Sequence, residues 1–264
     1  MKKTTPVAIR FIRFARLILH VMSGILQSIA YPHVSRATQH HMMKNWAMKV
    51  LKILNIRLHH TGKFPDENDQ HALLVANHVS WLDICLVMAI CPTQFVAKSE
   101  IRRWPVIGFL CRRVGTLFIE RAKRSDTARI NQVIGNVLMT GERVCIFPEG
   151  ATSDGMQIQH FHASLLQSAV NANALIYPVA IRYLDDTGNL CRDAAYTDIS
   201  LITSLKKILS QTRIDAVLNS SDAIHSEGKN RRELARLSEQ AIANSLSLSS
   251  YHNESEKPSY LPNA

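Results

Sequence analysis

Apolar residues follow two different spacings along this chain, and the change falls near residue 65. Before it, the segments 8–31 and 38–54 have the period of amphipathic helices. After it, short apolar runs alternate with helical patterns. The runs that predict strands are 56–60, which lies just before the change, 72–76, 95–97, 116–119, 144–147 and 176–183, with 213–218 as a further candidate. The helical patterns cover 82–89, 104–114, 127–140, 162–172 and 229–245.

This alternation predicts an α/β fold with a mixed, largely parallel sheet flanked by helices. We expect three parts: a cationic helical segment over 1–65, an α/β domain over 66–245 and a tail over 246–264. The tail is rich in Ser and Asn, so we expect it to be disordered.

The excess positive charge is concentrated at the N-terminus. The sequence has 31 Lys and Arg against 21 Asp and Glu, a formal net charge of +10. Residues 1–65 contain eleven of these cations and no acid, so the remainder is near neutral. A nucleic-acid-binding protein would have its charge on the folded domain, so nucleic acid is not an expected partner. A hydrophobic content of 46% excludes a mainly disordered chain.

The N-terminal segments fit a membrane surface better than a membrane span. The densest apolar stretch, 17–31, would be about 22 Å long as a helix, whereas a bilayer core needs about 30 Å. Cationic apolar helices bind anionic membrane surfaces, so we expect an N-terminal helical pair that holds the protein on a membrane. Two alternatives stay open: a signal peptide that ends near Ala30, and a second helix packed on its own domain.

The five cysteines indicate a reducing compartment. They are odd in number, and none forms a Cys-x-x-Cys pair. Such cysteines are typical of a cytosol-facing domain. Together with the N-terminal helices, they lead us to expect the protein on the cytoplasmic face of the inner (plasma) membrane. The histidine pairs 40–41 and 59–60 lack nearby Cys or carboxylate partners, so no metal site is expected.

The clearest chemistry follows the predicted strand 72–76. Asn77 and His78 come directly after it, where α/β folds usually have their active sites. The Ser80-x-x-Asp83 spacing has the form of a capping box, which predicts a helix with Ser80 as its N-cap. Asp83 in the first helical turn can then bind one imidazole nitrogen of His78 and make the other a better base. Such a dyad, with no nucleophile beside it, can take a proton from an incoming hydroxyl.

Three later segments join this His-x₄-Asp pair, which alone would more often be structural. They read Gly-Thr-Leu-Phe-Ile-Glu-Arg (115–121), Phe-Pro-Glu-Gly (147–150) and Ile-Tyr-Pro-Val-Ala (176–180). In order and spacing the four blocks, which lie within about 73–181, resemble the glycerolipid acyltransferase family. That family includes the bacterial 1-acylglycerol-3-phosphate acyltransferases and carries the HX4D motif.

The resemblance implies a role for each matching residue. His78 would be the general base on the acceptor hydroxyl, and Asp83 would orient it. The acyl donor would be acyl-CoA or acyl-carrier protein, used as a co-substrate without a metal or a bound organic cofactor. The positions implied to bind substrate are Lys98, Arg121, Glu149 and Gly150.

The third block departs from the family pattern. The family often has Phe-Pro-Glu-Gly-Thr-Arg-Ser, whereas residues 147–153 read Phe-Pro-Glu-Gly-Ala-Thr-Ser. A following Phe-Lys-x-Gly element appears as Phe-His-Ala-Ser over 161–164, so two cations are missing near the implied phosphate site. We expect acyl transfer to a lysophospholipid, first of all 1-acyl-sn-glycerol-3-phosphate, which would give phosphatidic acid. Lyso-ornithine lipid is an alternative acceptor, and a non-catalytic protein that binds anionic lipid is the second alternative.

Overall fold

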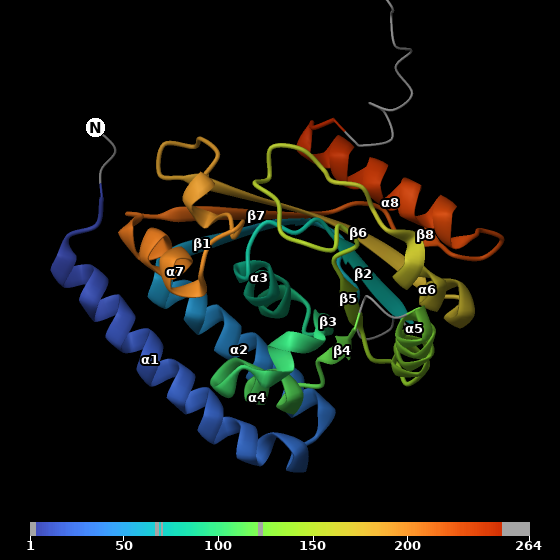
Figure 1. Ribbon diagram of the computed structural model, residues 1–264, viewed down its shortest axis with the longest axis horizontal. Coiled ribbons are helices and arrows are strands. Elements are labelled where there is room, and N and C mark those ends of the chain that lie inside the picture. Colours follow the sequence, from blue (N-terminus) through green and yellow to red (C-terminus); the bar gives the residue numbers. More distant parts are fainter. Residues whose placement is uncertain (1–3, 67–68, 70, 121–123, 250–264) are drawn as a thin grey trace, which may run out of the picture.

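The computed structural model describes residues 4–66, 69, 71–120 and 124–249 of the 264-residue chain. At its centre lies a sheet in the order β1-β7-β6-β2-β5-β3-β4, with β8 beside β6 (Figure 1). The strands are β1 (Ile56–Gly62), β2 (Ala72–Ala76), β3 (Gln94–Lys98), β4 (Leu117–Ile119), β5 (Val144–Ile146), β6 (Leu175–Asp185), β7 (Ile214–Ser220) and β8 (Ile224–His225).

Strand direction divides the sheet into two parts. Strands β4, β3, β5, β2 and β6 all run parallel. Strands β7 and β8 are antiparallel to β6, and β1 is parallel to β7. The prediction of a mixed, largely parallel sheet is therefore confirmed. Because the five parallel strands share one direction, the loops that follow them meet at one edge of the sheet.

Helices cover both faces of the sheet. One face carries α2 (Arg36–Leu54), α3 (Leu82–Ile90) and α7 (Leu201–Ser210), and the other carries α5 (Arg124–Met139), α6 (Gln167–Ala172) and α8 (Arg231–Leu246). Outside the first layer lie α1 (Val7–Ala30) and α4 (Pro105–Arg113), which contact each other. Short 3₁₀ helices are η1 (Tyr31–His33), η2 (Ser99–Arg103), η3 (Ala163–Leu166) and η4 (Arg192–Ala194).

Strand β2 shows why the central strands are continuously apolar. All five of its residues are buried. Leu74 belongs to the core on the α2–α3 side, and its neighbours Leu73 and Val75 belong to the core on the α5–α8 side. Successive side chains of a strand point to opposite faces, so a strand covered on both faces needs apolar residues at every position.

The second N-terminal helix is part of the domain core. Helix α2 packs against α3. Its predicted apolar stripe is largely buried there, at Met43, Ala47, Val50, Leu51 and Leu54. The apolar stripe of this helix therefore packs on its own domain, which was the alternative to a membrane contact. Strand β1, which follows α2 directly and also precedes residue 66, pairs with β7 along its whole length.

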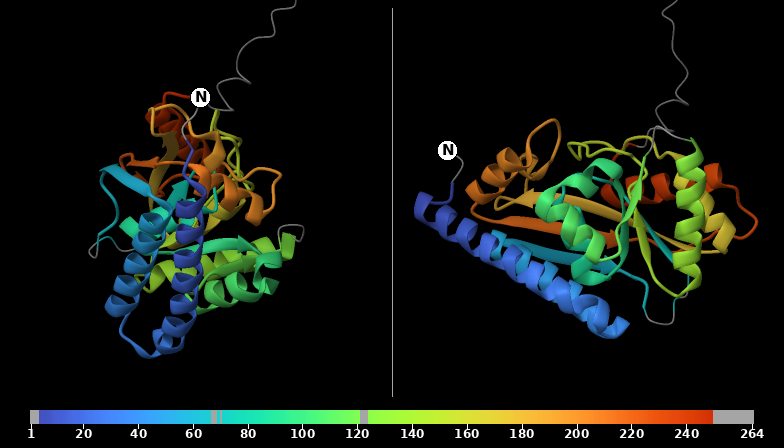
Figure 2. Two further views of the ribbon diagram at one scale, coloured as in Figure 1. Left: turned by 90° about the vertical axis from the view of Figure 1, so that its left-hand side faces the viewer. Right: turned by 60° about the horizontal axis from the view of Figure 1, so that its bottom comes forward.

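Helix α1 lies along α2 as an antiparallel partner (Figure 2). The buried His20 of α1 stacks on Trp46 of α2 with ring centroids 5.1 Å apart, and His20 Nε2 lies 3.0 Å from the Trp46 carbonyl oxygen. Gly24 lets the helices approach, because a Cβ there would lie 2.6 Å from Trp46 Nε1. This contact fixes one side of α1 and leaves the other side outward.

The outward side of α1 is apolar. Its large exposed apolar residues are Val7, Ile9, Phe11, Ile12, Phe14, Ile18, Leu19, Met22, Leu26 and Ile29. Two polar residues of the helix, Arg16 and Gln27, are also exposed. Within the described residues, no helix combines the length and the apolar character that a membrane crossing needs.

Three elements differ from the sequence prediction. Helix α7 and the two-residue strand β8 were not predicted. The helix predicted over 162–172 is wrong in its first part, where the chain forms η3 before α6 begins at Gln167. Helix α7 has a clear local signal, since the Ser200 side chain caps it by accepting a hydrogen bond from the Thr203 N–H.

The Asn77 side chain ties the end of β2 to β6. Asn77 Nδ2 donates to the Ile181 carbonyl at 3.0 Å, and the Ile181 N–H donates to Asn77 Oδ1 at 2.7 Å, both in the core. Asn77→Ala would leave two buried backbone groups unpaired, so we expect the free energy of unfolding to fall by about 3 kcal/mol. Urea unfolding followed by circular dichroism measures this. Arg236→Ala, at an exposed position of α8, is the control and should change stability by less than about 0.5 kcal/mol. Equal effects would contradict the assignment.

Candidate active site

His78 and Asp83 meet in the turn between β2 and α3. His78 Nδ1 lies 2.7 Å from Asp83 Oδ2. The helical N-cap is Trp81, and the Ser80 hydroxyl has no hydrogen-bond partner among the described residues. The predicted capping role of Ser80 is therefore wrong. The Asp83 carboxylate itself caps the turn, as its Oδ2 accepts the N–H groups of Val79 at 2.8 Å and Ser80 at 3.0 Å.

The Asp83 carboxylate is completely buried. A buried carboxylate is stable only where donors surround it, and this one receives them from its own turn and from the sheet. The donor from the sheet is the Tyr183 hydroxyl of β6, 2.5 Å from Asp83 Oδ1. With so many donors the carboxylate acts as an acceptor, so His78 Nδ1 carries the proton and Nε2 has the free lone pair.

The imidazole of His78 is held from its flat side as well. The Phe147 ring, directly after β5, stacks on it with centroids 4.0 Å apart and an angle of 14° between the planes. The side chain of His78 is 20% exposed, so the ring is fixed in the protein and still reachable. These contacts produce an oriented base at the carboxyl edge of the sheet.

The Phe-Pro-Glu-Gly turn holds the backbone of His78 at two points. Glu149 Oε1 accepts the His78 N–H at 3.0 Å, and the Ser153 N–H donates to the His78 carbonyl at 2.7 Å. Gly150 lies in this turn with a φ of 82°, a conformation that favours glycine. The first and third sequence blocks thus form one structure around His78.

Glu149 is a buried carboxyl group with an unusual protonation. Burial raises its pKa to about 8, and the Asp83 charge acts in the same direction, while the bond from the His78 N–H opposes them. Its second oxygen, Oε2, is buried without a hydrogen-bond partner in the described part of the chain. At neutral pH the group is therefore mostly protonated, which limits the negative charge beside the dyad.

The remaining implied substrate-binding positions are cationic. Lys98 is exposed at the carboxyl end of β3, on the same edge of the sheet as His78. Among the described residues, Lys98 forms no hydrogen bond or ion pair with His78 or Asp83. Arg121 lies outside the described residues. Of the six residues that the sequence assigns to the site, the structure brings Asp83 and Glu149 into direct contact with His78.

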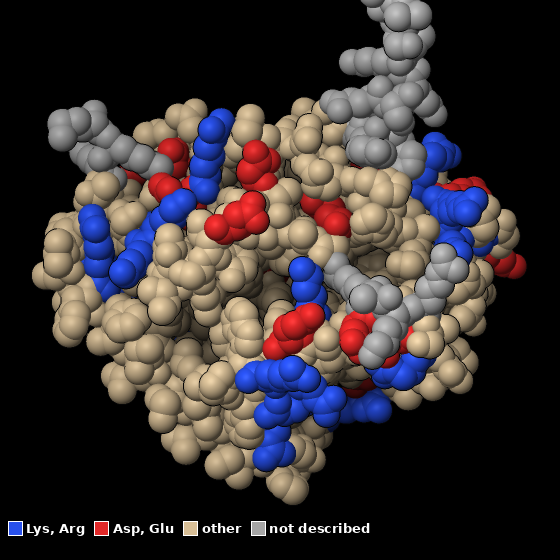
Figure 3. Space-filling view, in the orientation of Figure 1, with Lys and Arg blue, Asp and Glu red and all other residues tan. Residues whose placement is uncertain are grey.

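The face that carries these elements is shown in Figure 3, in which Lys and Arg side chains gather over η2 and α4 beside a hollow near the centre. The cations of these two elements are Arg102, Arg103, Arg112 and Arg113. They follow Lys98 in the chain and extend the positive charge on this side of the molecule.

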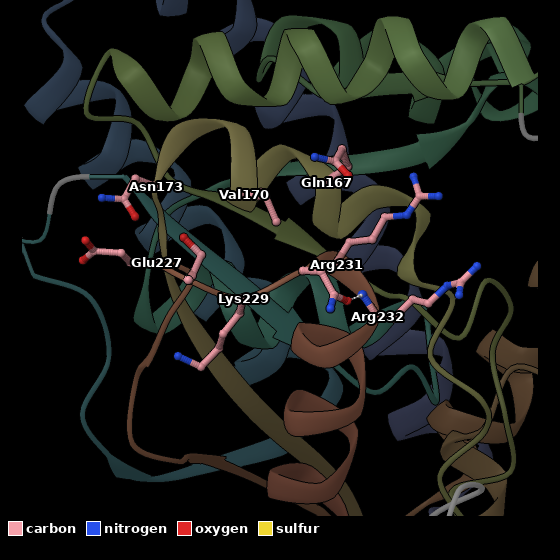
Figure 4. Close-up of a pocket in the computed structure, with 10 residues that line it drawn as sticks. Gln167, Val170, Asn173, Glu227, Lys229, Arg231 and Arg232 are labelled. Carbon is pink, nitrogen blue, oxygen red and sulfur yellow. Dashed lines mark hydrogen bonds between the residues drawn. The ribbon is translucent and has the colours of Figure 1, made fainter.

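A separate open pocket of about 860 Å³ lies between α6 and the start of α8 (Figure 4). Its lining includes Lys229, Arg231 and Arg232. The Ser226 N–H in this region donates to the Ala174 carbonyl, just before β6 begins. His78 instead follows the end of β2, which is parallel to β6. The pocket is thus at the opposite edge of the sheet and is not part of the dyad site.

Sequence reasoning missed Tyr183 and the stacking role of Phe147. A tyrosine within an apolar strand signals a buried hydroxyl that needs a partner, but the partner is 100 positions away. Among the described residues, no group of three or more His, Cys, Asp or Glu side chains is placed to hold a metal ion.

The fold and the site define an α/β protein with a histidine–aspartate dyad at the carboxyl edge of a mixed sheet, suited to removing a proton from a hydroxyl. A family model described as Acyltransferase matches residues 55–182. A lyso-ornithine lipid O-acyltransferase of Pseudomonas aeruginosa is 36% identical over 197 residues, 75% of each chain. The chain belongs to the acyltransferase family, as the four sequence blocks predicted.

Two further proteins show how far the similarity extends. A 1-acyl-sn-glycerol-3-phosphate acyltransferase of Neisseria meningitidis is 41% identical over 165 residues, which are 62% of this chain and 64% of that protein. The crystal structure of the 1-acyl-sn-glycerophosphate (LPA) acyltransferase PlsC of Thermotoga maritima has a TM-score of 0.69 at 18% identity. That match covers 91% of this chain and 94% of the other. This structural likeness confirms the fold.

Protonation of Glu149 predicts a pH-dependent stability. The unfolded chain loses this proton near the ordinary pKa of 4.5, and the folded protein near 8. Between these values the folded state holds the extra proton, so native stability falls as the pH rises. The variant Glu149→Gln cannot titrate there. Its stability relative to the wild type should therefore increase from pH 5 to 8, by up to about 1.4 kcal/mol per pH unit.

Urea unfolding of both proteins at several pH values measures this difference, and other titrating groups cancel in the comparison. A constant difference over the whole range would show that Glu149 has an ordinary pKa.

Proposed function

We propose that this protein is an O-acyltransferase that moves a fatty acyl group from acyl-CoA or acyl-carrier protein to the hydroxyl of a lysophospholipid. The observation that carries the proposal is the 2.7 Å contact between His78 Nδ1 and Asp83 Oδ2 at the carboxyl edge of the sheet, which assigns the role of base to Nε2. A protein that merely binds lipid needs no such oriented base, which disfavours the non-catalytic alternative.

The proposed reaction is a direct transfer. His78 Nε2 takes the proton of the acceptor hydroxyl while its oxygen attacks the thioester carbonyl carbon. The new C–O ester bond forms, the C–S bond breaks, and the proton passes from the imidazolium to the leaving thiolate. Asp83 stabilises the transient imidazolium through the bond to Nδ1. A thioester is already activated, so the reaction needs no covalent enzyme intermediate.

The first proposed acceptor is 1-acyl-sn-glycerol-3-phosphate, with phosphatidic acid as product. The neisserial relative at 41% identity bears this activity in its name. Arg121 and Lys98 would bind the acceptor phosphate, and the turn of Glu149 and Gly150 would shape the acceptor site. The cations of η2 and α4 provide a positive surface in the same region.

Lyso-ornithine lipid is the second proposed acceptor, and a specific observation favours it. Ala151 and Thr152 follow Gly150 where the family often has Thr and Arg, so the turn beside His78 lacks a cation. The Thr152 hydroxyl instead bonds to the Tyr196 carbonyl. The relative that shares three quarters of its length with this chain is named for this acceptor.

The proposed location is the cytoplasmic face of the inner (plasma) membrane, with the outward apolar side of α1 against an anionic lipid surface. All five cysteines lie in the described part of the chain, none of them in a disulfide and four of them buried, in accord with a reducing compartment. A site on the membrane surface would receive a lipid acceptor directly.

An acceptor panel tests the activity. Purified protein in detergent is offered lysophosphatidate, head-group lysolipids and lyso-ornithine lipid, each with both donor types. His78→Ala removes the base and should lower turnover of the accepted lipid by about 10³-fold. The exposed His225→Ala is the matched control and should retain full activity. Equal turnover by wild type and His78→Ala would disprove the mechanism.

The membrane contact has its own test on α1. Removing the N-terminal helices would destroy the core around α2, so surface substitutions are more informative. Phe11→Ser and Leu19→Ser change side chains that are 71% and 70% exposed, and together they should reduce sedimentation with anionic vesicles at least tenfold. Met139→Ser, at a 63% exposed position on α5, is the control and should bind as the wild type does. Unchanged sedimentation of the α1 double variant would exclude α1 as the contact.

A further inference from the structure

Tyr183 reaches the dyad from β6, on the face of the sheet that α3 covers. It lies in β6 and is fully buried, and its hydroxyl donates to Asp83 Oδ1 at 2.5 Å. Burial and the neighbouring Asp83 charge raise the pKa of this phenol well above its ordinary value, so the hydroxyl stays a donor. The residue has no access to substrate, and its contact with the reaction passes through Asp83.

The two oxygens of Asp83 have different partners. Oδ2 accepts His78 Nδ1 and the N–H groups of Val79 and Ser80. Oδ1 has Tyr183 as its donor, with no other hydrogen bond to this oxygen among the described residues. All the donors on Oδ2 come from one turn, so a bond from the opposite side fixes the rotation of the carboxylate about Cβ–Cγ. It also draws negative charge toward Oδ1 and away from the imidazole.

We propose that Tyr183 is a positioning residue for the dyad, which orients the Asp83 carboxylate and limits the negative charge that His78 meets. The inference rests on the proposed function of His78 as a general base. It assigns to β6 a role in the chemistry besides its place in the sheet, at a position that lies outside the four sequence blocks.

Several titratable groups lie around Asp83 and bear on a test that uses pH. They are His78, Tyr183, Glu149 and three buried thiols, Cys85 of α3, Cys145 of β5 and Cys191 before η4. Burial raises the pKa of Cys85 to about 12 and that of Cys145 well above its ordinary value. Glu149 titrates near pH 8, so the acid side of an activity profile is the informative region.

The test compares Tyr183→Phe with Tyr177→Phe. Both residues are buried on the same face of β6, and the hydroxyl of Tyr177 bonds to Asp69 and not to the dyad. In Tyr183→Phe the carboxylate loses its Oδ1 donor. We expect kcat to fall about tenfold, equivalent to about 1.4 kcal/mol, with KM unchanged within twofold. The acid limb of kcat/KM should move to higher pH, because a more negative carboxylate favours the protonated imidazole. Tyr177→Phe should alter neither.

A second measurement does not depend on turnover. In protein labelled at histidine, the Nδ1–H proton of His78 gives an NMR signal that reports the bond to Asp83. It should move downfield in Tyr183→Phe and stay in place in Tyr177→Phe. An unmoved signal together with an unmoved acid limb, in a variant that folds normally, would overturn the role of Tyr183. A wild type that acylates no acceptor while this signal still moves would refute the proposed function alone.

Discussion

One buried negative charge organises the centre of this structure. The Asp83 carboxylate is removed completely from water, which is tolerable only where donors surround it. Those donors are two backbone N–H groups of its own turn, the imidazole of His78 and a phenol from β6. The turn after β2 must therefore close tightly, and β6 must lie beside β2 in one register. The proposed chemistry and the burial of Asp83 thus both require β2, α3 and β6 to lie in this arrangement.

The parallel part of the sheet places the His78–Asp83 pair at the carboxyl edge, where the imidazole is partly exposed. Strands β2 and β5 end at the same edge, so the Phe-Pro-Glu-Gly turn after β5 lies against the His78 turn after β2. That turn holds the His78 backbone through Glu149 and Ser153 and its ring through Phe147. A protonated Glu149 can accept the His78 N–H without placing a second full charge next to Asp83. Burial without sufficient donors raises the pKa of Glu149, whereas the neighbouring Asp83 carboxylate is surrounded by donors.

The sequence predicted those features that depend on neighbouring residues. The alternation of strands and helices, the position of β2 and the meeting of His78 with Asp83 all follow from local spacing. The capping role of Ser80 was wrong because the Asp83 N–H, which the Ser80 hydroxyl would have accepted, donates to the Ser80 carbonyl instead. The reverse bond, from the Ser80 N–H to the Asp83 carboxylate, is formed. Tyr183 could not be found, since its partner is set by the pairing of β6 with β2 and not by distance along the chain. The sequence likewise did not decide whether α2 contacts lipid or the core, because an amphipathic helix has the same sequence pattern in both cases.

The N-terminal cations have structural contacts as well as a proposed attraction to lipid. Arg13 donates to the Gln211 and Thr212 carbonyls, and Arg36 pairs with Glu142 at 3.3 Å, so some of the eleven cations hold the protein together. The apolar stripe of α2 is buried in the core, so the exposed apolar side of α1 is the unusual feature of the N-terminal helices. A monomeric protein seldom leaves so long an apolar face in water. The membrane proposal therefore depends chiefly on this face of α1, and the cations that remain free add attraction to an anionic lipid surface.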